Sequence, residues 1–419
     1  MPQRTGSARG RGGLLWHRDF RLLWIGQASS QLGSSVTSVA MPLLAVATLN
    51  ATAFEAAMLY AASWLPWLII GLPAGAWVDR LRRRPVMVAC DTASMLLFFS
   101  VPVAAWLDML TIGHLIAVAL AAGTAAVFFQ TACQAYLPSL LDKQALPEGN
   151  TKLHGTESAM QIAGPGVAGL LAQLAGAVTA VLLDALSFAA SALCLWAIRF
   201  REPRQPRPVA ANLSREIAEG IRFVARDPYL RVLTAFGAVS NIGLIGYQSI
   251  LVVFLVRDVG LSAGMVGGLL AATSCGGVLG AAAATRISLR FGTARGMLLC
   301  NVGALPFGLL IPLTDSGPRL GLLVAGGLVI GVGVVAGNVI KGVFRQQYTP
   351  PHLLGRVLVS MQFLNLGAIP LGGLIAGTLG STLGVRPAMW IMTAGLALAG
   401  LILLIGPMRH QRDLPERPE

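Results

Sequence analysis

The chain has 419 residues, of which 55% are hydrophobic and only 12% are charged. A soluble domain carries roughly 25% charged residues, so this composition excludes an ordinary soluble protein and indicates helices that lie in lipid. The net charge of +13 is spread over short basic clusters between apolar segments instead of one basic domain. We therefore expect no nucleic-acid partner, because a nucleic-acid-binding protein gathers its basic residues on one face or domain.

Residues 1–18 are rich in Gly and Arg, and we expect this basic N-terminus to be disordered. The apolar segment that follows begins near Phe20 and runs too long for the core of a signal peptide. It is predicted to be a retained membrane span.

Twelve apolar segments along the chain are predicted to cross the membrane, since a span needs roughly 20 apolar residues. The expected fold is an all-α integral membrane protein with twelve transmembrane helices in two pseudo-symmetric six-helix bundles. The predicted spans are 20–49, 54–78, 86–107, 113–137, 157–176, 178–199, 230–256, 264–287, 296–314, 319–344, 356–382 and 386–407.

The basic residues are distributed unequally between the two sets of loops. With the N-terminus placed in the cytoplasm, the cytoplasmic segments hold 28 of the 31 Lys and Arg residues. Only Arg257, Arg319 and Arg386 fall on the other side, and an even number of spans returns the C-terminus to the cytoplasm. The positive-inside rule therefore predicts a multi-pass protein of the cell membrane with both termini cytoplasmic.

A polar stretch, 199–226, divides the apolar segments six and six. Apolar residues recur at helical spacing in its second half, so we expect an amphipathic helix, either on the inner membrane surface or as a solvated linker. The predicted parts of the chain are the N-terminus 1–18, a first bundle 19–199, the linker 200–229, a second bundle 230–407 and a cytoplasmic tail 408–419.

Related residues recur at half the chain length. An offset of 206 residues aligns Gly71 with Gly277 and Arg80 with Arg286. Duplicated halves around a central cavity are a common plan of transporters.

The segment after the second predicted span combines glycines with charges. Gly71 and Gly75 form a Gly-x-x-x-Gly pair, which lets two helices approach closely. Asp79 follows at the helix end, and Arg80 and Arg84 belong to the basic cluster after it. Asp79 can pair with an arginine or with the positive N-terminus of a neighbouring helix, which predicts a gate contact that exists in one conformation only. The basic cluster can equally be an ordinary orientation signal.

This segment resembles the signature loop between helices two and three of the major facilitator superfamily. The family's usual glycine three residues after the Asp is replaced by Arg82, and the second-half loop has Thr285 where an Asp would fall. The resemblance implies two six-helix bundles that expose a central site alternately to each side of the membrane. Only the first copy of the loop is complete as a gate.

A proline-glycine motif lies in the fifth predicted span, where Gly164, Pro165 and Gly169 permit a bend and close helix contact. It resembles the motif of superfamily exporters, which implies efflux, although its upstream glycines are missing and a simple packing kink explains it equally well. The stretches 136–140, 183–188, 219–223 and 354–356 resemble the drug:proton antiporter branch that includes macrolide-efflux and enterobactin-exporter proteins.

Two acids, Asp91 and Asp184, fall inside predicted spans. Burying an ionisable group in hydrocarbon costs several kcal/mol unless the group has a role or a partner. Either acid is a candidate for carrying the proton that couples transport to a proton gradient. Alternatively, Asp91 pairs with Arg83 or Arg84, and Asp184 hydrogen-bonds a neighbouring helix.

Polar residues in the first, seventh and eleventh predicted spans are candidates for lining a wet cavity, since amides can orient a polar group on an apolar substrate. They can equally bond helix to helix. The candidates are Gln27, Gln31, Ser34, Asn241, Gln248, Gln362 and Asn365.

The sequence predicts no cofactor, no metal and no catalytic residues. None of the five cysteines has the spacing of a zinc set or a redox motif, and the five histidines are scattered at helix ends or loops, which argues against an intramembrane enzyme. An ATP-driven pump is not expected, because the Gly-x-x-x-x-Gly-Lys-Ser/Thr phosphate loop does not occur. The loops on the outer side are too short for the sensor domain of a receptor.

The resulting hypothesis is a monomeric secondary transporter in the lipid bilayer. It exports a drug-like, antibiotic or siderophore-type small molecule by alternating access, coupled to protons. The alternative is a major facilitator importer or uniporter of a small metabolite, and only the helix-five motif and the branch resemblance favour efflux.

Overall fold

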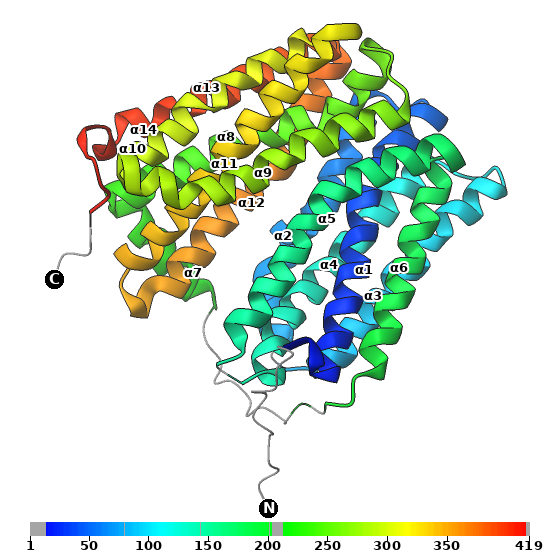
Figure 1. Cartoon of the computed structure of the whole chain (residues 1–419), viewed down its shortest axis with the longest axis horizontal. Helices are drawn as coiled ribbons and strands as arrows, with labels where there is room; N and C mark the ends of the chain where they lie inside the picture. The colour runs from blue at the N-terminus through cyan, green and yellow to red at the C-terminus, as the bar shows by residue number, and fades with distance from the viewer. Residues whose placement is uncertain (1–13, 79, 143, 201, 203–212, 416–419) are drawn as a thin grey trace, which may run out of the picture.

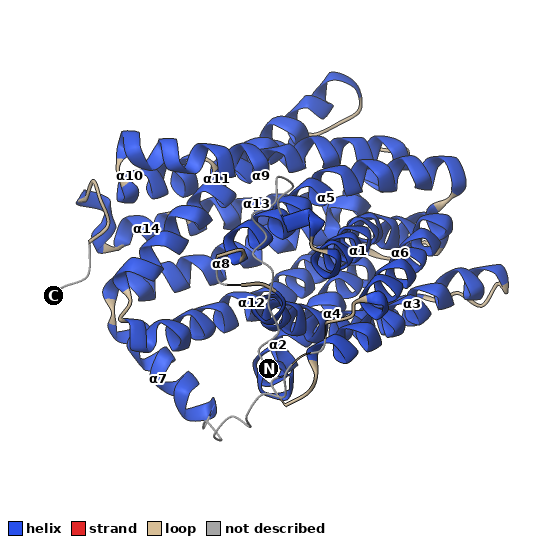
Figure 2. Ribbon diagram, turned by 60° about the horizontal axis from the view of Figure 1, so that its bottom comes forward, coloured by secondary structure: helices blue, strands red, loops and turns tan. Residues whose placement is uncertain are grey.

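The computed structural model describes residues 14–78, 80–142, 144–200, 202 and 213–415. Every regular element within these ranges is a helix, as Figure 2 shows. Helices suit lipid because they satisfy all backbone hydrogen bonds within one segment. The helices are α1 (Arg18–Leu43), α2 (Ala53–Val78), α3 (Arg83–Trp106), α4 (Ile112–Leu140), α5 (Leu146–Ala175), α6 (Ala177–Ala197), α7 (Leu213–Arg226), α8 (Pro228–Val253), α9 (Ala263–Phe291), α10 (Thr293–Leu298), α11 (Leu320–Tyr348), α12 (Pro351–Thr382), α13 (Val385–Ala399) and α14 (Leu401–Ile405).

Eleven helical segments in the described ranges are long and apolar enough to cross a membrane. They include every helix of more than 20 residues except α5, and one of them continues from α10 to Leu313. The first half of α5 carries Glu148, Lys152 and Glu157, which explains why it falls outside this set. The sequence predicts a span that begins at 157, whereas the helix begins at Leu146 with this polar portion.

The helices form two bundles, which Figure 1 shows side by side. In the first bundle, α1 packs against α5 and α6, and α3 packs against α4 and α6. In the second bundle, α8 packs against α12 and α13, and α9 packs against α11. The main contacts between the bundles are those of α2 with α12 and of α5 with α9, and α8 also contacts α2 and α1.

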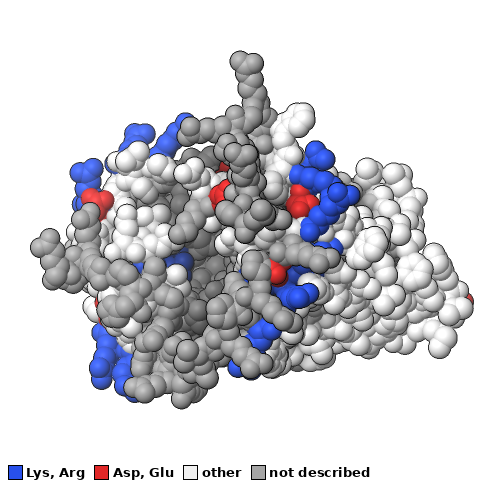
Figure 3. Space-filling view, turned by 90° about the horizontal axis from the view of Figure 1, so that it is seen from below, with Lys and Arg blue, Asp and Glu red and all other residues white. Residues whose placement is uncertain are grey.

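The loops lie on two opposite faces of the molecule. We call one the linker face, because the start of α1, the end of α6 and α7 lie there; the other is the far face, where α5 turns into α6. In Figure 1 the bundles meet near the far face, at the top, and diverge towards the linker face at the bottom. Figure 3 shows the molecule from below, with Lys and Arg side chains gathered at several places on this face.

Backbone positions with positive φ repeat between the two halves. The pairs are Asn50 with Gly260, Asp108 with Gly317, and Gly176 with Gly384. Each pair is 208 to 210 residues apart, and its members occupy equivalent turns, where Gly, Asn or Asp tolerates the left-handed conformation. At this offset Gly71 corresponds to Gly280, and the predicted alignment with Gly277 was wrong by three residues.

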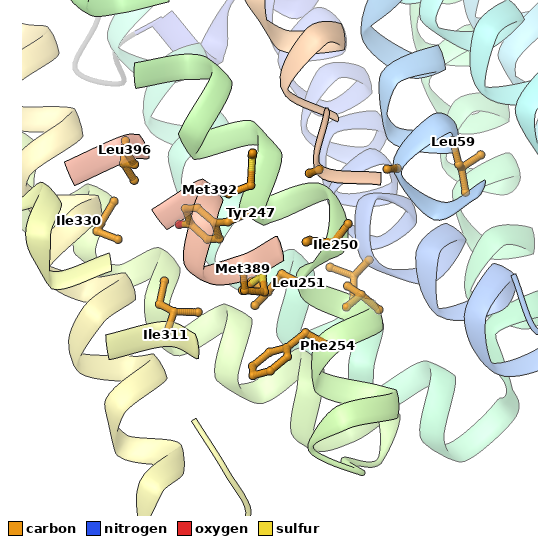
Figure 4. Packing of buried hydrophobic residues seen from close by; sticks show 14 of the residues in the cluster. Leu59, Tyr247, Ile250, Leu251, Phe254, Ile311, Ile330, Met389, Met392 and Leu396 are labelled. Carbon is orange, nitrogen blue, oxygen red and sulfur yellow. The ribbon is translucent and has the colours of Figure 1, made fainter. Parts of the chain in front are cut away.

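The apolar core of the second bundle lies between α8, α11, α13 and the 3-10 helix Leu305–Leu313. Figure 4 shows Tyr247 and Phe254 beside Met389 and Met392 in this core. Leu59 of α2 belongs to the same buried cluster, although α2 is part of the first bundle. Apolar packing is therefore continuous across the junction of the bundles.

The helix α7 lies in the stretch for which the sequence predicts an amphipathic helix. It packs against α8 and α12, and Val224 is buried in the same cluster as Leu230 and Val357. The helix therefore rests on the second bundle, which neither predicted placement included.

An acid that follows the last helix of each bundle caps the third span of that bundle. Glu202 accepts a hydrogen bond from the backbone N–H of Arg83 at 2.8 Å, and Asp413 accepts one from that of Thr293 at 2.9 Å. A carboxylate is favourable there because the first N–H groups of a helix lack partners within the helix. The internal repeat therefore includes this contact between the end of each bundle and the start of its third span.

Candidate functional site

A polar pocket of about 460 Å³ lies in the second bundle, mostly between α8, α11 and α12. Three of the predicted cavity residues line it, namely Asn241, Gln362 and Asn365, together with Asn301 and Asn338. Amides inside an apolar bundle are costly unless water, a partner helix or a ligand satisfies them. Their gathering around one open space is the property expected of a ligand site.

A smaller polar pocket lies in the first bundle between α1, α4 and α5. Gln27 and Gln31, which are also predicted cavity residues, lie in its wall beside Gln130 and Gln134. Ser34 and Gln248 line neither pocket. The structure therefore divides the predicted cavity residues between two pockets, one in each bundle.

The proline-glycine motif of α5 makes two close helix contacts. A Cβ added at Gly164 would lie 3.1 Å from the backbone carbonyl carbon of Ser35 in α1. A Cβ at Gly169 would lie 2.6 Å from the Cα of Gly267 in α9, and the carbonyl oxygen of Pro165 faces Gly267 as well. The motif thus joins the two bundles on the far-face side, at a distance that admits only glycine.

The second junction, between α2 and α12, is a run of small residues. From the far face inwards the facing pairs are Ala53 with Gly380, Ala57 with Gly377, Ala61 with Gly373, and Leu68 with Gly367. Beyond these pairs the contact ends, because a Cβ at Gly71 would meet only Trp67 of its own helix and one at Gly75 would meet nothing within 4 Å. Among the described residues, no other helix lies within 4 Å of a Cβ at Gly71 or Gly75. The close helix contact predicted for them stays a prediction.

The charges of the predicted gate have different surroundings. Asp79 lies outside the described residues, and Arg80 is exposed. Arg84 donates hydrogen bonds to the backbone carbonyl oxygens of Leu195, at 2.9 Å, and Trp196. Arg84 therefore caps the end of α6, where the last carbonyls lack partners and a cation is favourable.

Arg83 and Glu202 form an ion pair at 3.1 Å, and each side chain is only 8% exposed. Arg83 also donates to the hydroxyl of Ser139 at 3.1 Å. These contacts tie α3, α4 and the start of the linker together on the linker face of the first bundle.

Glu202→Gln is expected to lower the free energy of unfolding by about 2 kcal/mol, because it replaces the charge-assisted hydrogen bonds between Glu202 and Arg83 with weaker neutral ones. Thermal unfolding of the purified chain in detergent measures the loss. Glu148→Gln is the control, since the Glu148 side chain is 47% exposed and its pair with Lys152 is worth little. Equal melting temperatures for the two variants would contradict the assignment.

Asp91 and Asp184 are buried inside the first bundle. Asp184 faces Gly33 of α1 and accepts a hydrogen bond from the hydroxyl of Ser187 at 3.2 Å. One carboxyl oxygen of each acid is buried without a hydrogen-bond partner in the described part of the chain. Neither acid lines either of the two pockets described above. Arg83 pairs with Glu202, and Arg84 binds the end of α6.

Comparison with known proteins identifies the chain. A family model described as transmembrane secretion effector matches residues 14–418. The chain belongs to this family. Among curated relatives, the chain resembles the multidrug efflux pump Tap of Mycolicibacterium fortuitum, with 29% identity over 92% of this chain and 95% of the relative.

The chain shares its fold with solved transporter structures. The nucleoside transporter NupG superposes with a TM-score of 0.74 at 13% identity, over 94% of this chain and 99% of NupG. A bacterial homologue of the iron transporter ferroportin, 16% identical, gives 0.74 in its inward-facing state, over 93% of this chain and 98% of the homologue. The outward-facing state of the same homologue gives a TM-score of 0.60, over 94% of this chain and 100% of the homologue. These likenesses show that the chain has the fold of these transporters.

Two basic residues in the larger pocket are absent from the predicted site. Lys341 and Arg345 lie one turn apart on α11 and line the pocket. The sequence places them with the cytoplasmic charges, because the predicted span ends at 344 and basic residues near span ends normally signal orientation. A signal was present, since the chain has 28 arginines but three lysines, and Lys341 is the only lysine inside a predicted span.

Proposed function

We propose that this transporter exports drug-like small molecules from the cell in exchange for protons. The observation that carries the proposal is the similarity to Tap, named as a multidrug efflux pump, along 92% of the chain. The pocket of about 460 Å³ supports it, because its amides lie beside an apolar wall formed by leucines and Phe236. Such a lining suits molecules that carry a few polar groups on an apolar body.

In this proposal the transporter has twelve spans, and its linker face lies in the cytoplasm. The twelfth span is α5, which packs between α1 of its own bundle and α9 of the other. The far face then becomes the outer side of the membrane. It carries only a few basic residues, namely Arg257, Arg319 and Arg386. The positive-inside rule supports this orientation.

Alternating access opens the far face and closes the linker face. The facing pairs of α2 and α12, continued in the same antiparallel register, bring Gly75 opposite Ser360. Asp79 follows Gly75 in the sequence and lies outside the described residues, and an arginine is its predicted partner. In the closed linker face the glycine would allow close helix contact, and the carboxylate would pair with the guanidinium. The gate charge would then be satisfied in only one of the two states.

Transport in everted membrane vesicles tests the efflux proposal. With the linker face outside, energised vesicles that contain the protein should accumulate members of a drug and siderophore panel. The accumulation should collapse when an uncoupler dissipates the proton gradient. Accumulation that persists unchanged with the uncoupler would contradict proton exchange, and uptake into right-side-out vesicles instead would contradict efflux.

Asp184→Asn tests the proposed proton carrier. Asn matches the shape of Asp and can keep the contact with Ser187, but it cannot take up and release a proton. We expect loss of gradient-driven efflux with an unchanged melting temperature. Asp91→Asn measured in parallel assigns the role between the two acids, and wild-type efflux by the Asp184 variant would remove Asp184 as the carrier.

A further inference from the structure

Lys341 and Arg345 give the pocket of the second bundle a positive charge. Among the described residues that line it, no Asp or Glu balances the two cations. A charge inside a membrane bundle is costly and normally has a counter-charge or a function. The pocket therefore lacks a negative charge to balance the two cations, and an acidic ligand can supply it.

The donor groups of both side chains remain available to a ligand. The ammonium of Lys341 lies 4.7 Å from the centre of the Phe236 ring and makes no hydrogen bond or ion pair in the described part of the chain. Arg345 donates its Nε–H to the backbone carbonyl of Lys341 at 3.3 Å, which turns the guanidinium towards the same turn of α11. The contact with the ring holds Lys341 in the pocket without satisfying its three N–H donors.

The remainder of the lining separates into an amide layer and an apolar wall. Asn338 and Gln362 are exposed in the pocket, although both lie within long helices. The apolar wall is formed by Leu233, Leu244, Leu305, Val334 and Leu396, among others. Val334 precedes Lys341 by seven residues, which is two helical turns, so these two residues lie about 10 Å apart along α11.

We propose that this pocket binds an amphipathic anion through its acidic group. Lys341 and Arg345 hold a carboxylate, phosphate or sulfonate by charge-assisted hydrogen bonds, and the guanidinium offers two parallel N–H groups to it. The apolar body, about 10 Å long, lies along α11 towards Val334 and Leu396. The assignment deepens the proposed efflux function, because it names acids with an apolar body as the class of substrate.

Equilibrium binding to the purified full chain in nanodiscs tests the site. The probes are phenylbutyrate and phenylbutanol, which differ in their acidic group and share an apolar body of similar length. We expect phenylbutyrate to bind at least about tenfold more tightly, since one charge-assisted hydrogen bond contributes about 1.5 kcal/mol or more. Equal binding of the two probes would overturn the proposal.

Variants assign the binding to the two cations. Lys341→Gln should weaken phenylbutyrate binding about tenfold and leave phenylbutanol unchanged, whereas Lys341→Arg should retain most of the affinity. Lys152→Gln is the matched control, since Lys152 lies on α5 and pairs with Glu148. Wild-type affinity of Lys341→Gln for the acid would overturn the proposal, as would an equal loss with Lys341→Arg. Melting temperatures identify any variant that does not fold, and Arg345→Gln then provides the second test.

The lipid composition distinguishes two sources of the acidic group. In discs of phosphatidylcholine alone, phenylbutyrate reports the empty site. If phosphatidylglycerol added to the discs weakens phenylbutyrate binding, the acid that the site binds in the cell is a lipid headgroup. If phosphatidylglycerol has no effect on phenylbutyrate binding, the site binds a free solute. Because the assay measures binding without transport, the site can be confirmed even when the vesicle experiment shows no efflux, and the reverse also holds.

Discussion

Gly267→Leu should prevent the two bundles from closing at the far face. A Cβ at this position would lie 2.5 Å from the carbonyl oxygen of Pro165 and 2.7 Å from the backbone nitrogen of Gly169. Both are backbone atoms that a rotamer change cannot move, so α5 and α9 must separate. Overpacking of this kind costs about 2 kcal/mol, which shifts the balance between the two states roughly thirtyfold away from the present one.

The neighbouring glycine provides a matched control for this prediction. Nothing lies within 4 Å of a Cβ at Gly268, one position further along α9. Gly268→Leu should therefore leave the melting temperature and transport near the wild-type values, while Gly267→Leu lowers both. Thermal unfolding and vesicle transport of the two variants give the comparison, and equal behaviour would show that the α5–α9 contact does not hold the far face closed.

Gly75→Trp is expected to have the opposite effect, because it leaves the present conformation intact and blocks the alternative one. None of the described residues lies within 4 Å of a Cβ at Gly75, so folding and melting temperature should not change. When α2 and α12 close on the linker face, the indole would occupy the space that Ser360 and its helix need. Transport should fall below about a tenth of the wild-type rate, because the closed state becomes less populated by an order of magnitude or more.

Substitutions of graded size separate the gate from a general defect. Gly75→Ala should retain most of the transport rate, since a methyl group is tolerated where small residues face each other. Gly321→Trp is the control for a bulky side chain, because a Cβ at Gly321 also meets nothing within 4 Å and the residue begins α11 on the far face. Wild-type transport by Gly75→Trp would contradict the role of this surface as the gate.

The helices were the most predictable part of the molecule. Continuous apolar stretches must form helices in lipid, so the positions of the spans follow from composition and length. The start of α5 was not predictable in this way, since a helix that packs between two others and extends beyond the apolar layer can carry Glu148 and Lys152. Hydropathy marks only the portion of a helix that contacts lipid or a dry interior.

The glycine motifs show what spacing can and cannot predict. The small residues around Gly164 and Gly169 indicate close helix contact, and the structure identifies Ser35 and Gly267 as the partners. The same kind of pattern at Gly71 and Gly75 meets no partner helix in this conformation. A sequence encodes the contacts of every state that the protein adopts, whereas one structure shows the contacts of one state.

The basic residues of the larger pocket were missed for a physical reason. Near the end of a span a lysine can serve as an orientation signal or as a ligand-binding group, and the sequence pattern is the same for both. Only the continuation of α11 to Tyr348 and the position of Phe236 place Lys341 in the pocket. The polar candidates Asn241 and Gln362 were within reach of the sequence, because amides in the middle of spans are uncommon enough to suggest a cavity.

Distances between spin labels across each face test the central claim, that the two faces open in alternation. In a variant without the five native cysteines, one pair of labels joins Arg80 to Gln346 across the linker face, and another joins Thr179 to Ser262 across the far face. Adding a transported drug or changing the proton gradient should shorten the first distance and lengthen the second in the same fraction of molecules. Two distances that stay fixed, or that change independently of each other, would contradict the account.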